Sequence, residues 1–142
     1  NLEEYLKAQA THMHFEYFME AVGFEDARVS LRPHEDIVST RCVVDNQGII
    51  PQVTLRKAVE RLGTEVVDLV KLDCEGAEWE MFKDEETWRR IRNLTMEYHL
   101  WPNHHHEEIR RTVEALGFKV KNQQRTHQVY GLLAAYRPGA KT

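Results

Sequence analysis

The sequence is poor in cysteine, proline and long apolar runs, and it has no excess of basic residues. It holds two cysteines and four prolines, and 19 lysines and arginines stand against 23 aspartates and glutamates. With a formal charge of −4 it lacks the clustered cations that bind phosphate backbones, so we expect no nucleic-acid partner. The longest apolar stretches, such as residues 132–135, fall far short of the roughly 20 residues of a membrane helix, so we expect no membrane association.

The two cysteines, Cys42 and Cys74, lie in separate segments and do not form the dense framework of a small secreted fold. We therefore expect reduced thiols and a cytoplasmic location. The chain opens at Asn1 inside a helical pattern, without a leader peptide or an initiator Met, and we interpret it as a processed or truncated product. Its length of 142 residues, with 42% apolar and 30% charged residues, is typical of a single globular domain over residues 1–142.

The first half of the chain predicts one helix, a region of short strands and a second helix. Apolar residues at spacings of three and four indicate a helix over residues 2–22, which Gly23 is expected to end. Short β-prone runs and turn residues over 27–52 favour short strands or loop. Thr54 is expected to cap a helix over residues 55–62.

The second half has the pattern of a parallel α/β sheet. A nearly continuous apolar run predicts a strand that is covered on both faces, and it leads through a helical segment to a second parallel strand. Trp79 and Trp88 are expected to pack in the core or at its rim. In chain order the expected elements are a strand over 66–72, a helix over 77–92 in two pieces with Asp84 capping the second, a strand from Leu94 to Leu100, a helix begun by Asn103 and ended by Gly117, and an antiparallel pair over 118–121 and 128–136.

Carboxylates gather where the first of these parallel strands ends, in the run KLDCEGAEWE. Asp73 terminates the strand, Glu75 and Gly76 make the turn, and Glu78 enters the next helix. Ligands of open α/β sheets bind beyond the carboxyl ends of the strands, so this turn is a candidate site. The alternative is that the acidic residues only favour the start of a helix and that Asp73 caps it.

The second parallel strand ends in TMEYHLW, where alternation sends Glu97 and His99 to one face of the sheet. If the two strands are neighbours, Asp73 shares a crevice with both residues. A carboxylate and an imidazole there could take a proton from a hydroxyl group, bind a metal or hold a polar ligand. The alternative is a surface glutamate and a histidine whose polar groups are satisfied inside the fold. Carboxylates of Asp73, Glu75 and Glu97 suit Mg²⁺ by ligand type, but we expect no metal.

The run KLDCEGAE over residues 71–78, preceded by VTL over 53–55 and followed by TMEYHLW over 95–101, resembles the C-terminal half of an FkbM-type S-adenosylmethionine-dependent methyltransferase. The resemblance covers roughly residues 50–136. It implies a Rossmann-like class I methyltransferase sheet, mostly parallel, with a C-terminal antiparallel strand pair. It also implies S-adenosylmethionine as cofactor and a small molecule as substrate.

The same resemblance implies a cofactor half that the sequence does not display. Methyltransferases of this class hold the methionine part of the cofactor on a glycine-rich turn and the ribose on an acidic residue ending the second strand. None of the seven glycines here forms a G-x-G arrangement, so no cofactor-binding residue is assigned. We interpret the chain as the C-terminal part of a methyltransferase domain lacking the first cofactor-binding strands, or as a degenerate homologue. Its expected partners are therefore a missing N-terminal half or a second copy of the chain.

By this resemblance the intact enzyme transfers a methyl group to the hydroxyl of a small molecule or a sugar, and the chain alone is expected to have little or no activity. We assign the base or substrate contact to Glu97 or His99. The residues expected to bind substrate are Asp73, Glu75, Gly76 and Glu78. Two alternatives remain open, a non-catalytic α/β interaction module derived from the same fold and a carboxylate-rich metal-dependent hydrolase.

Overall fold

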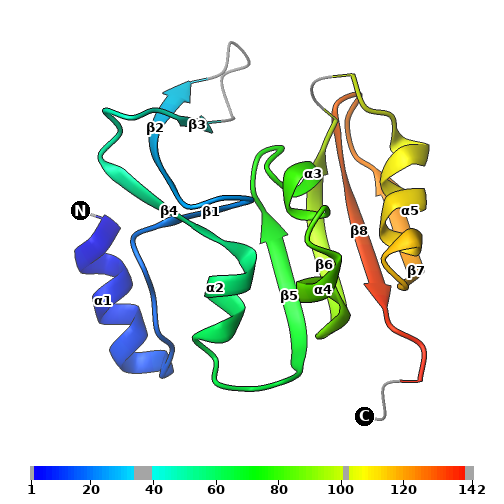
Figure 1. The fold of residues 1–142 in the computed structure, drawn as a ribbon, viewed down its shortest axis with the longest axis horizontal. Coiled ribbons are helices and arrows are strands. Elements are labelled where there is room, and N and C mark those ends of the chain that lie inside the picture. The colour runs from blue at the N-terminus through cyan, green and yellow to red at the C-terminus, as the bar shows by residue number, and fades with distance from the viewer. Residues whose placement is uncertain (1, 34–39, 101–102, 140–142) are drawn as a thin grey trace.

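The computed structural model describes residues 2–33, 40–100 and 103–139, and within them two four-stranded sheets and five helices make a mixed α/β structure (Figure 1). The helices are α1 (Leu2–Met13), α2 (Leu55–Glu60), α3 (Glu78–Met81), α4 (Glu85–Arg89) and α5 (His106–Ala115). The strands of the first sheet are β1 (Ala21–Gly23), β2 (Ala27–Pro33), β3 (Thr40–Val44) and β4 (Ile50–Thr54). Those of the second are β5 (Val67–Asp73), β6 (Ile91–His99), β7 (Lys119–Arg125) and β8 (Tyr130–Tyr136).

The first helix is shorter than the sequence predicts. Helix α1 ends at Met13, because His14 adopts a left-handed conformation with φ 58°. The apolar residues that continue the helical spacing lead into β1, which pairs in parallel with β4. Gly23 is the last residue of that strand and not a helix cap; a Cβ atom there would lie 2.5 Å from Cδ of Gln52. Strand pairing has overridden the local helical pattern.

The first sheet has the order β1-β4-β2-β3, with one parallel pair and two antiparallel pairs. Short strands over 27–52 are thus confirmed. Helix α2 follows β4 directly, and the hydroxyl of Thr54 accepts a hydrogen bond from the Lys57 amide at 3.1 Å, as predicted for its cap.

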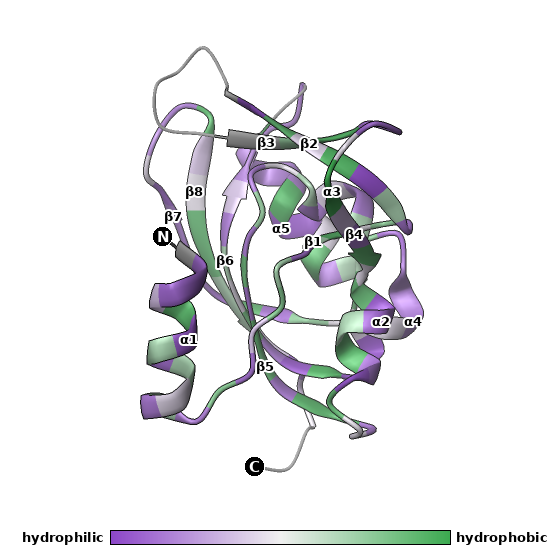
Figure 2. Ribbon diagram, turned by 90° about the vertical axis from the view of Figure 1, so that its left-hand side faces the viewer, coloured by the Kyte–Doolittle hydropathy of each residue, from purple (hydrophilic) through white to green (hydrophobic). Residues whose placement is uncertain are grey.

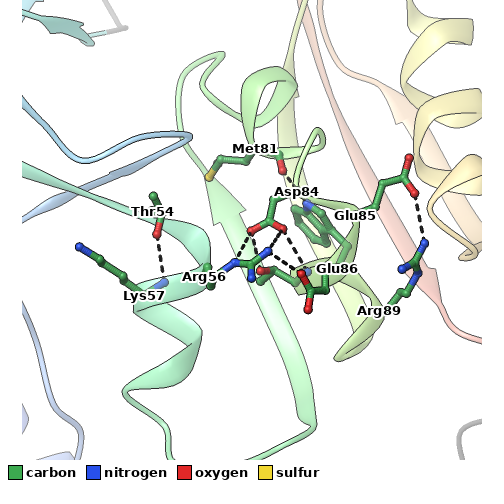
Figure 3. A network of polar contacts seen from close by, with 10 residues as sticks. Thr54, Arg56, Lys57, Met81, Asp84, Glu85, Glu86 and Arg89 are labelled. Carbon is green, nitrogen blue, oxygen red and sulfur yellow. Dashed lines mark hydrogen bonds and ion pairs between the residues drawn. The ribbon is translucent and has the colours of Figure 1, made fainter.

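An arginine fork joins α2 to the start of α4 (Figure 3). The Arg56 guanidinium lies 2.8 Å from Asp84 Oδ1 and 2.9 Å from Glu86 Oε2. Asp84 also caps α4, accepting the amide of Thr87 at 3.3 Å, which confirms the predicted break between the two helical pieces. Burial favours the neutral carboxyl, but the bonds from Arg56 and Thr87 outweigh it and lower the pKa of Asp84.

The second sheet has the order β5-β6-β8-β7. Strands β5 and β6 are parallel, and β7 and β8 form the predicted antiparallel pair at the C-terminal side. Helix α5 begins later than predicted, since its N-cap is His105, whereas Asn103 has φ 70°. Because β1–β4 form a sheet of their own, the described residues do not build one continuous Rossmann sheet.

The core lies between one face of the second sheet and its helices. In Figure 2, α2, α3, α4 and α5 lie on one side of β5 and β6. Trp88, Tyr98 and Ile109 are fully buried in this layer. The opposite face is open in the described part of the chain, where the side chain of Leu69 is 58% exposed. The prediction that this strand is covered on both faces is therefore wrong for the described residues.

Among the described residues no helix is both long enough and apolar enough to cross a lipid bilayer. Both cysteines carry free thiols, Cys42 at the surface and Cys74 partly buried beside the end of β5.

Candidate functional site

The two parallel strands end side by side and bring the predicted residues together. Asp73 is the register partner of Glu97 across the ladder, and His99 follows two residues later on the same face of β6. One ligand atom from each of Asp73, Glu97 and His99 lies within 4.8 Å of the others. The three residues therefore converge as expected, while their chemical roles stay predictions.

A pocket of about 270 Å³ opens beside these strand ends on the uncovered face of the sheet. Its wall carries groups that donate and groups that accept hydrogen bonds, together with the apolar surface of β8. The polar residues that line it are Lys71, Asp73, Thr95, Glu97 and Asn122.

His99 is the most deeply buried of the convergent residues, with 3% of its side chain exposed. Its Nε2 lies 3.2 Å from Glu75 Oε2 and 3.6 Å from Glu97 Oε1, and its Nδ1 lies 3.8 Å from Glu78 Oε1. Burial alone would lower the pKa of His99. The contact with Glu78 and the charges of the surrounding glutamates outweigh burial and raise that pKa above its usual value. The imidazole is thus held as a cation over a wider pH range than in solution.

Glu75 sits in a turn of unusual conformation. Its φ is 51°, and the following Gly76 has φ 100°, a value that suits glycine because it has no Cβ atom. Burial, opposed by His99 and reinforced by the negative charge of Asp73 and Glu97, raises the pKa of Glu75. The turn thereby presents a carboxyl that gives up its proton less readily than a surface glutamate.

Glu78 is placed differently from the other predicted substrate residues. Its side chain is completely buried, and its two oxygens accept the main-chain amides of Gly76 at 2.9 Å and His99 at 2.6 Å. A buried carboxylate is stable when it is hydrogen-bonded in this way. That Glu78 binds substrate stays a prediction, but its burial favours a role inside the fold.

Trp79 belongs to the site, although its sequence pattern indicated only packing. Its indole N–H donates to the main-chain carbonyl of His99 at 2.6 Å. Its ring stacks on His104 with centroids 3.7 Å apart and meets Phe82 edge to face. No sequence signal distinguishes such a tryptophan from a core tryptophan, because the bond joins residues 20 positions apart.

Cys74 lies between Asp73 and Glu75 in the sequence, but its thiol has low reactivity. Burial, reinforced by the charge of Glu78, raises the pKa of its thiol to about 12. The thiol is therefore protonated near neutral pH, and nucleophilic chemistry in this site does not come from Cys74.

The donor set could also receive a divalent cation. The sequence pointed to Asp73, Glu75 and Glu97 as carboxylate ligands, whereas the structure groups Asp73 and Glu97 with the imidazole of His99. Oxygen and imidazole donors together suit transition-metal ions better than Mg²⁺. Because the raised pKa of His99 favours its protonated form, a metal ion would have to displace that proton to bind the imidazole.

Comparison with known proteins places the chain in a family. Residues 4–120 match the family model described as the Methyltransferase FkbM domain. No curated protein and no solved structure matches the chain. The family match confirms the resemblance seen in the sequence, and it begins well before residue 50, where that resemblance was expected to start.

Proposed function

Because the chain belongs to the FkbM methyltransferase family, we propose that it serves S-adenosylmethionine-dependent methyl transfer to a hydroxyl oxygen of a small molecule or a sugar. The observation that carries the proposal is the convergence of Asp73, Glu97 and His99 beside a polar pocket at the ends of two parallel strands. Open α/β sheets bind their ligands at such strand ends.

The donor set fits the reacting end of the cofactor. S-adenosylmethionine supplies a methyl group on a positively charged sulfonium, and a crevice with several carboxylates favours a cation by charge. In the described part of the chain no residue is assigned to the methionine carboxylate or to the ribose, and no G-x-G turn is present. The fit thus concerns the reacting end of the cofactor and not its methionine carboxylate or its ribose.

Glu97 is the better candidate for the proton acceptor. Its side chain is 35% exposed and lines the pocket, whereas His99 is nearly buried and its raised pKa favours the protonated imidazole. As the acceptor oxygen takes the methyl group, its proton passes to Glu97, whose Oε1 lies 3.6 Å from Nε2 of His99. His99 would act as the base only at a pH above its raised pKa.

The remaining residues are proposed to hold the acceptor. Asp73 and Glu75 accept hydrogen bonds from hydroxyl groups, and Gly76 keeps the turn close to the ligand because it has no side chain. Lys71 and Asn122 add donors to the same pocket. A mixed set of donors and acceptors is suited to a polyhydroxylated acceptor such as a sugar.

We also propose that the second sheet is part of a Rossmann-like methyltransferase sheet. In the described residues β6 is the only strand that pairs with β5, so the opposite edge of β5, which ends at Asp73, has no strand beside it. A further parallel strand, from a missing N-terminal half or from a second copy of the chain, would extend the sheet there and complete the cofactor side. A cytoplasmic location accords with the two free thiols.

The test combines binding and transfer. Isothermal titration with S-adenosylhomocysteine and transfer of labelled methyl from S-adenosylmethionine to a panel of glycosides are expected to give a signal with the complete protein. Glu97→Gln should lower kcat by roughly 10²–10⁴-fold, the usual contribution of a general base, with the melting temperature nearly unchanged. Glu80→Gln is the matched control, because Glu80 is exposed and forms a surface ion pair with Lys83. Equal kcat in the two variants would remove Glu97 from the chemistry.

The same experiments separate the alternatives. A complete protein that binds no cofactor would favour a non-catalytic interaction module. The metal-dependent hydrolase is favoured by the convergence of Asp73, Glu97 and His99, and it predicts that Mn²⁺ raises the melting temperature of the wild type but not of Asp73→Asn. If Mn²⁺ does not raise the melting temperature of the wild type, the hydrolase hypothesis is wrong.

A further inference from the structure

Strand β6 continues two residues past the end of β5, so His99 has no residue of β5 beside it. The register between β5 and β6 ends with Asp73 opposite Glu97, so β5 offers no partner to a residue two positions later. On the other side His99 still lies opposite Tyr130 of β8. A residue that a neighbouring strand supports on one side frays more readily than one that is held on both sides, so its side chain needs further support to keep a fixed direction.

Two consecutive side chains of α3 take the place of the missing strand. Glu78 accepts the main-chain N–H of His99 at 2.6 Å, and Trp79 donates its indole N–H to the main-chain carbonyl of the same residue at 2.6 Å. Both polar groups of one peptide residue are therefore satisfied by neighbouring residues of one helix. This is the pair of bonds that a parallel strand would otherwise supply.

We infer that Glu78 and Trp79 are positioning residues, which hold the backbone of His99 so that its imidazole stays in the crevice beside Asp73 and Glu97. The inference rests on the proposed function only for the use of His99 in the site. The two contacts, called here the His99 clamp, are a property of the fold and can be measured without any activity.

The clamp is itself anchored on both sides. The second oxygen of Glu78 accepts the amide of Gly76 at 2.9 Å, so one buried carboxylate ties the turn after β5 to the end of β6. The ring of Trp79 is fixed by its stack on His104 and its edge contact with Phe82. A displacement of either residue would therefore change the distance between the two strand ends.

The orientation of the imidazole follows from this arrangement. With the backbone of His99 held, Nε2 faces the carboxylates of Glu75 and Glu97, while Nδ1 faces Glu78. A carboxylate behind a histidine is the usual means by which proteins fix a working imidazole. Glu78 thus acts through His99 and does not touch the acceptor.

The test compares four variants of the full chain. Trp79→Phe removes the indole donor and keeps an aromatic ring, and Glu78→Gln leaves one carbonyl oxygen where two acceptors stood. The matched control for the first is Trp88→Phe, which removes an indole bond of the same kind to the carbonyl of Met81. The control for the second is Glu80→Gln, an exposed carboxylate on the same helix.

Amide hydrogen exchange followed by NMR is the readout, with the amide of Met96 on the same strand as internal reference. We expect the His99 amide to be protected in the wild type and to exchange on the order of tenfold faster, relative to Met96, in Trp79→Phe and Glu78→Gln. The controls should change both amides alike, even where they lower the melting temperature. In the ¹³C-labelled histidine spectrum the His99 ring signal, assigned by its loss in His99→Gln, should shift and broaden in Glu78→Gln.

Equal relative exchange in the clamp variants and their controls would overturn the inference. So would an unprotected His99 amide in the wild type, a measurement that stands even if Glu78→Gln does not fold. Where methyl transfer is detected, Trp79→Phe should lower kcat about tenfold with the KM for S-adenosylmethionine unchanged. If the complete protein transfers no methyl group, the proposed function fails, while the exchange data still decide whether the clamp exists.

Discussion

The pH dependence of stability gives a direct test of the charge arrangement around His99. The native structure raises the pKa of both His99 and Glu75, so the folded chain binds these protons more tightly than the unfolded chain does. Stability from each group is complete below its unfolded pKa and is lost as the pH rises through its folded pKa. Raising the pH from weakly acidic to alkaline values should therefore destabilise the protein.

The slope has an upper limit set by proton number. Each proton held by the native state and not by the unfolded state changes the free energy of unfolding by at most about 1.4 kcal/mol per pH unit. For Glu75 the loss begins above its ordinary value of 4.5, and for His99 it begins above 6.5. Both groups therefore destabilise the protein in the same direction, as the pH rises.

Carboxylates elsewhere act in the opposite direction at lower pH. The native structure lowers the pKa of Asp26, Asp45, Asp84 and Glu108, so their stabilisation is lost as the solution becomes more acidic than their usual range. These opposite signs predict a maximum of stability at weakly acidic pH. Stability should fall on both sides of it.

Urea unfolding followed by tryptophan fluorescence at a series of pH values measures the effect, since Trp88 is fully buried and reports on the core. His99→Gln should flatten the fall in stability above pH 6.5, and Glu75→Gln should flatten the fall that begins above pH 4.5. His127→Gln serves as the histidine control. A wild-type stability that stays constant or increases between pH 6 and 9 would refute the charge arrangement described for the site.

Two further predictions concern single residues. Arg137→Ala should destabilise the protein by about 2–3 kcal/mol in the same urea assay, because the Arg137 guanidinium donates to three main-chain carbonyls at the ends of α4 and α5 and the start of β6. Arg89→Ala is the control, since Arg89 forms an exposed ion pair with Glu85 on the same helix, and an equal loss of stability in the two variants would contradict the prediction. Cys74, with a thiol pKa of about 12, should react with iodoacetamide far more slowly at pH 8 than a free thiol peptide, as measured by mass spectrometry. Equal rates would show that the thiol is not buried as described.

Local signals in the sequence predicted several elements well. Thr54 and Asp84 start helices as expected, because a side-chain oxygen at an N-cap acts on an amide only three residues away. The convergence of Asp73 with Glu97 was also predictable, since two neighbouring parallel strands end at the same edge of a sheet. In each case the deciding physics is local or follows from sheet geometry.

The failures have a common physical cause in contacts between distant segments. The helix expected over residues 2–22 ends at Met13, because residues 21–23 find a strand partner about 30 residues further on. The roles of Glu78 and Trp79 depend on bonds to His99, and no spacing in the sequence encodes them. The sequence also failed to predict the exposed face of β5, because an apolar run does not show whether other elements cover one face of a strand or both.

The arginine fork between α2 and α4 connects the two sheets of the molecule. Helix α2 follows directly from the first sheet, and α4 leads into β6 of the second, so Arg56 fastens one half of the molecule to the other through charge. Since Arg56 is partly exposed, concentrated salt weakens this fastening before it disturbs the apolar interior. The apolar contacts of Leu55 and Val59 with the core of the second sheet do not depend on salt, so they should keep the two halves together after the arginine fork has weakened.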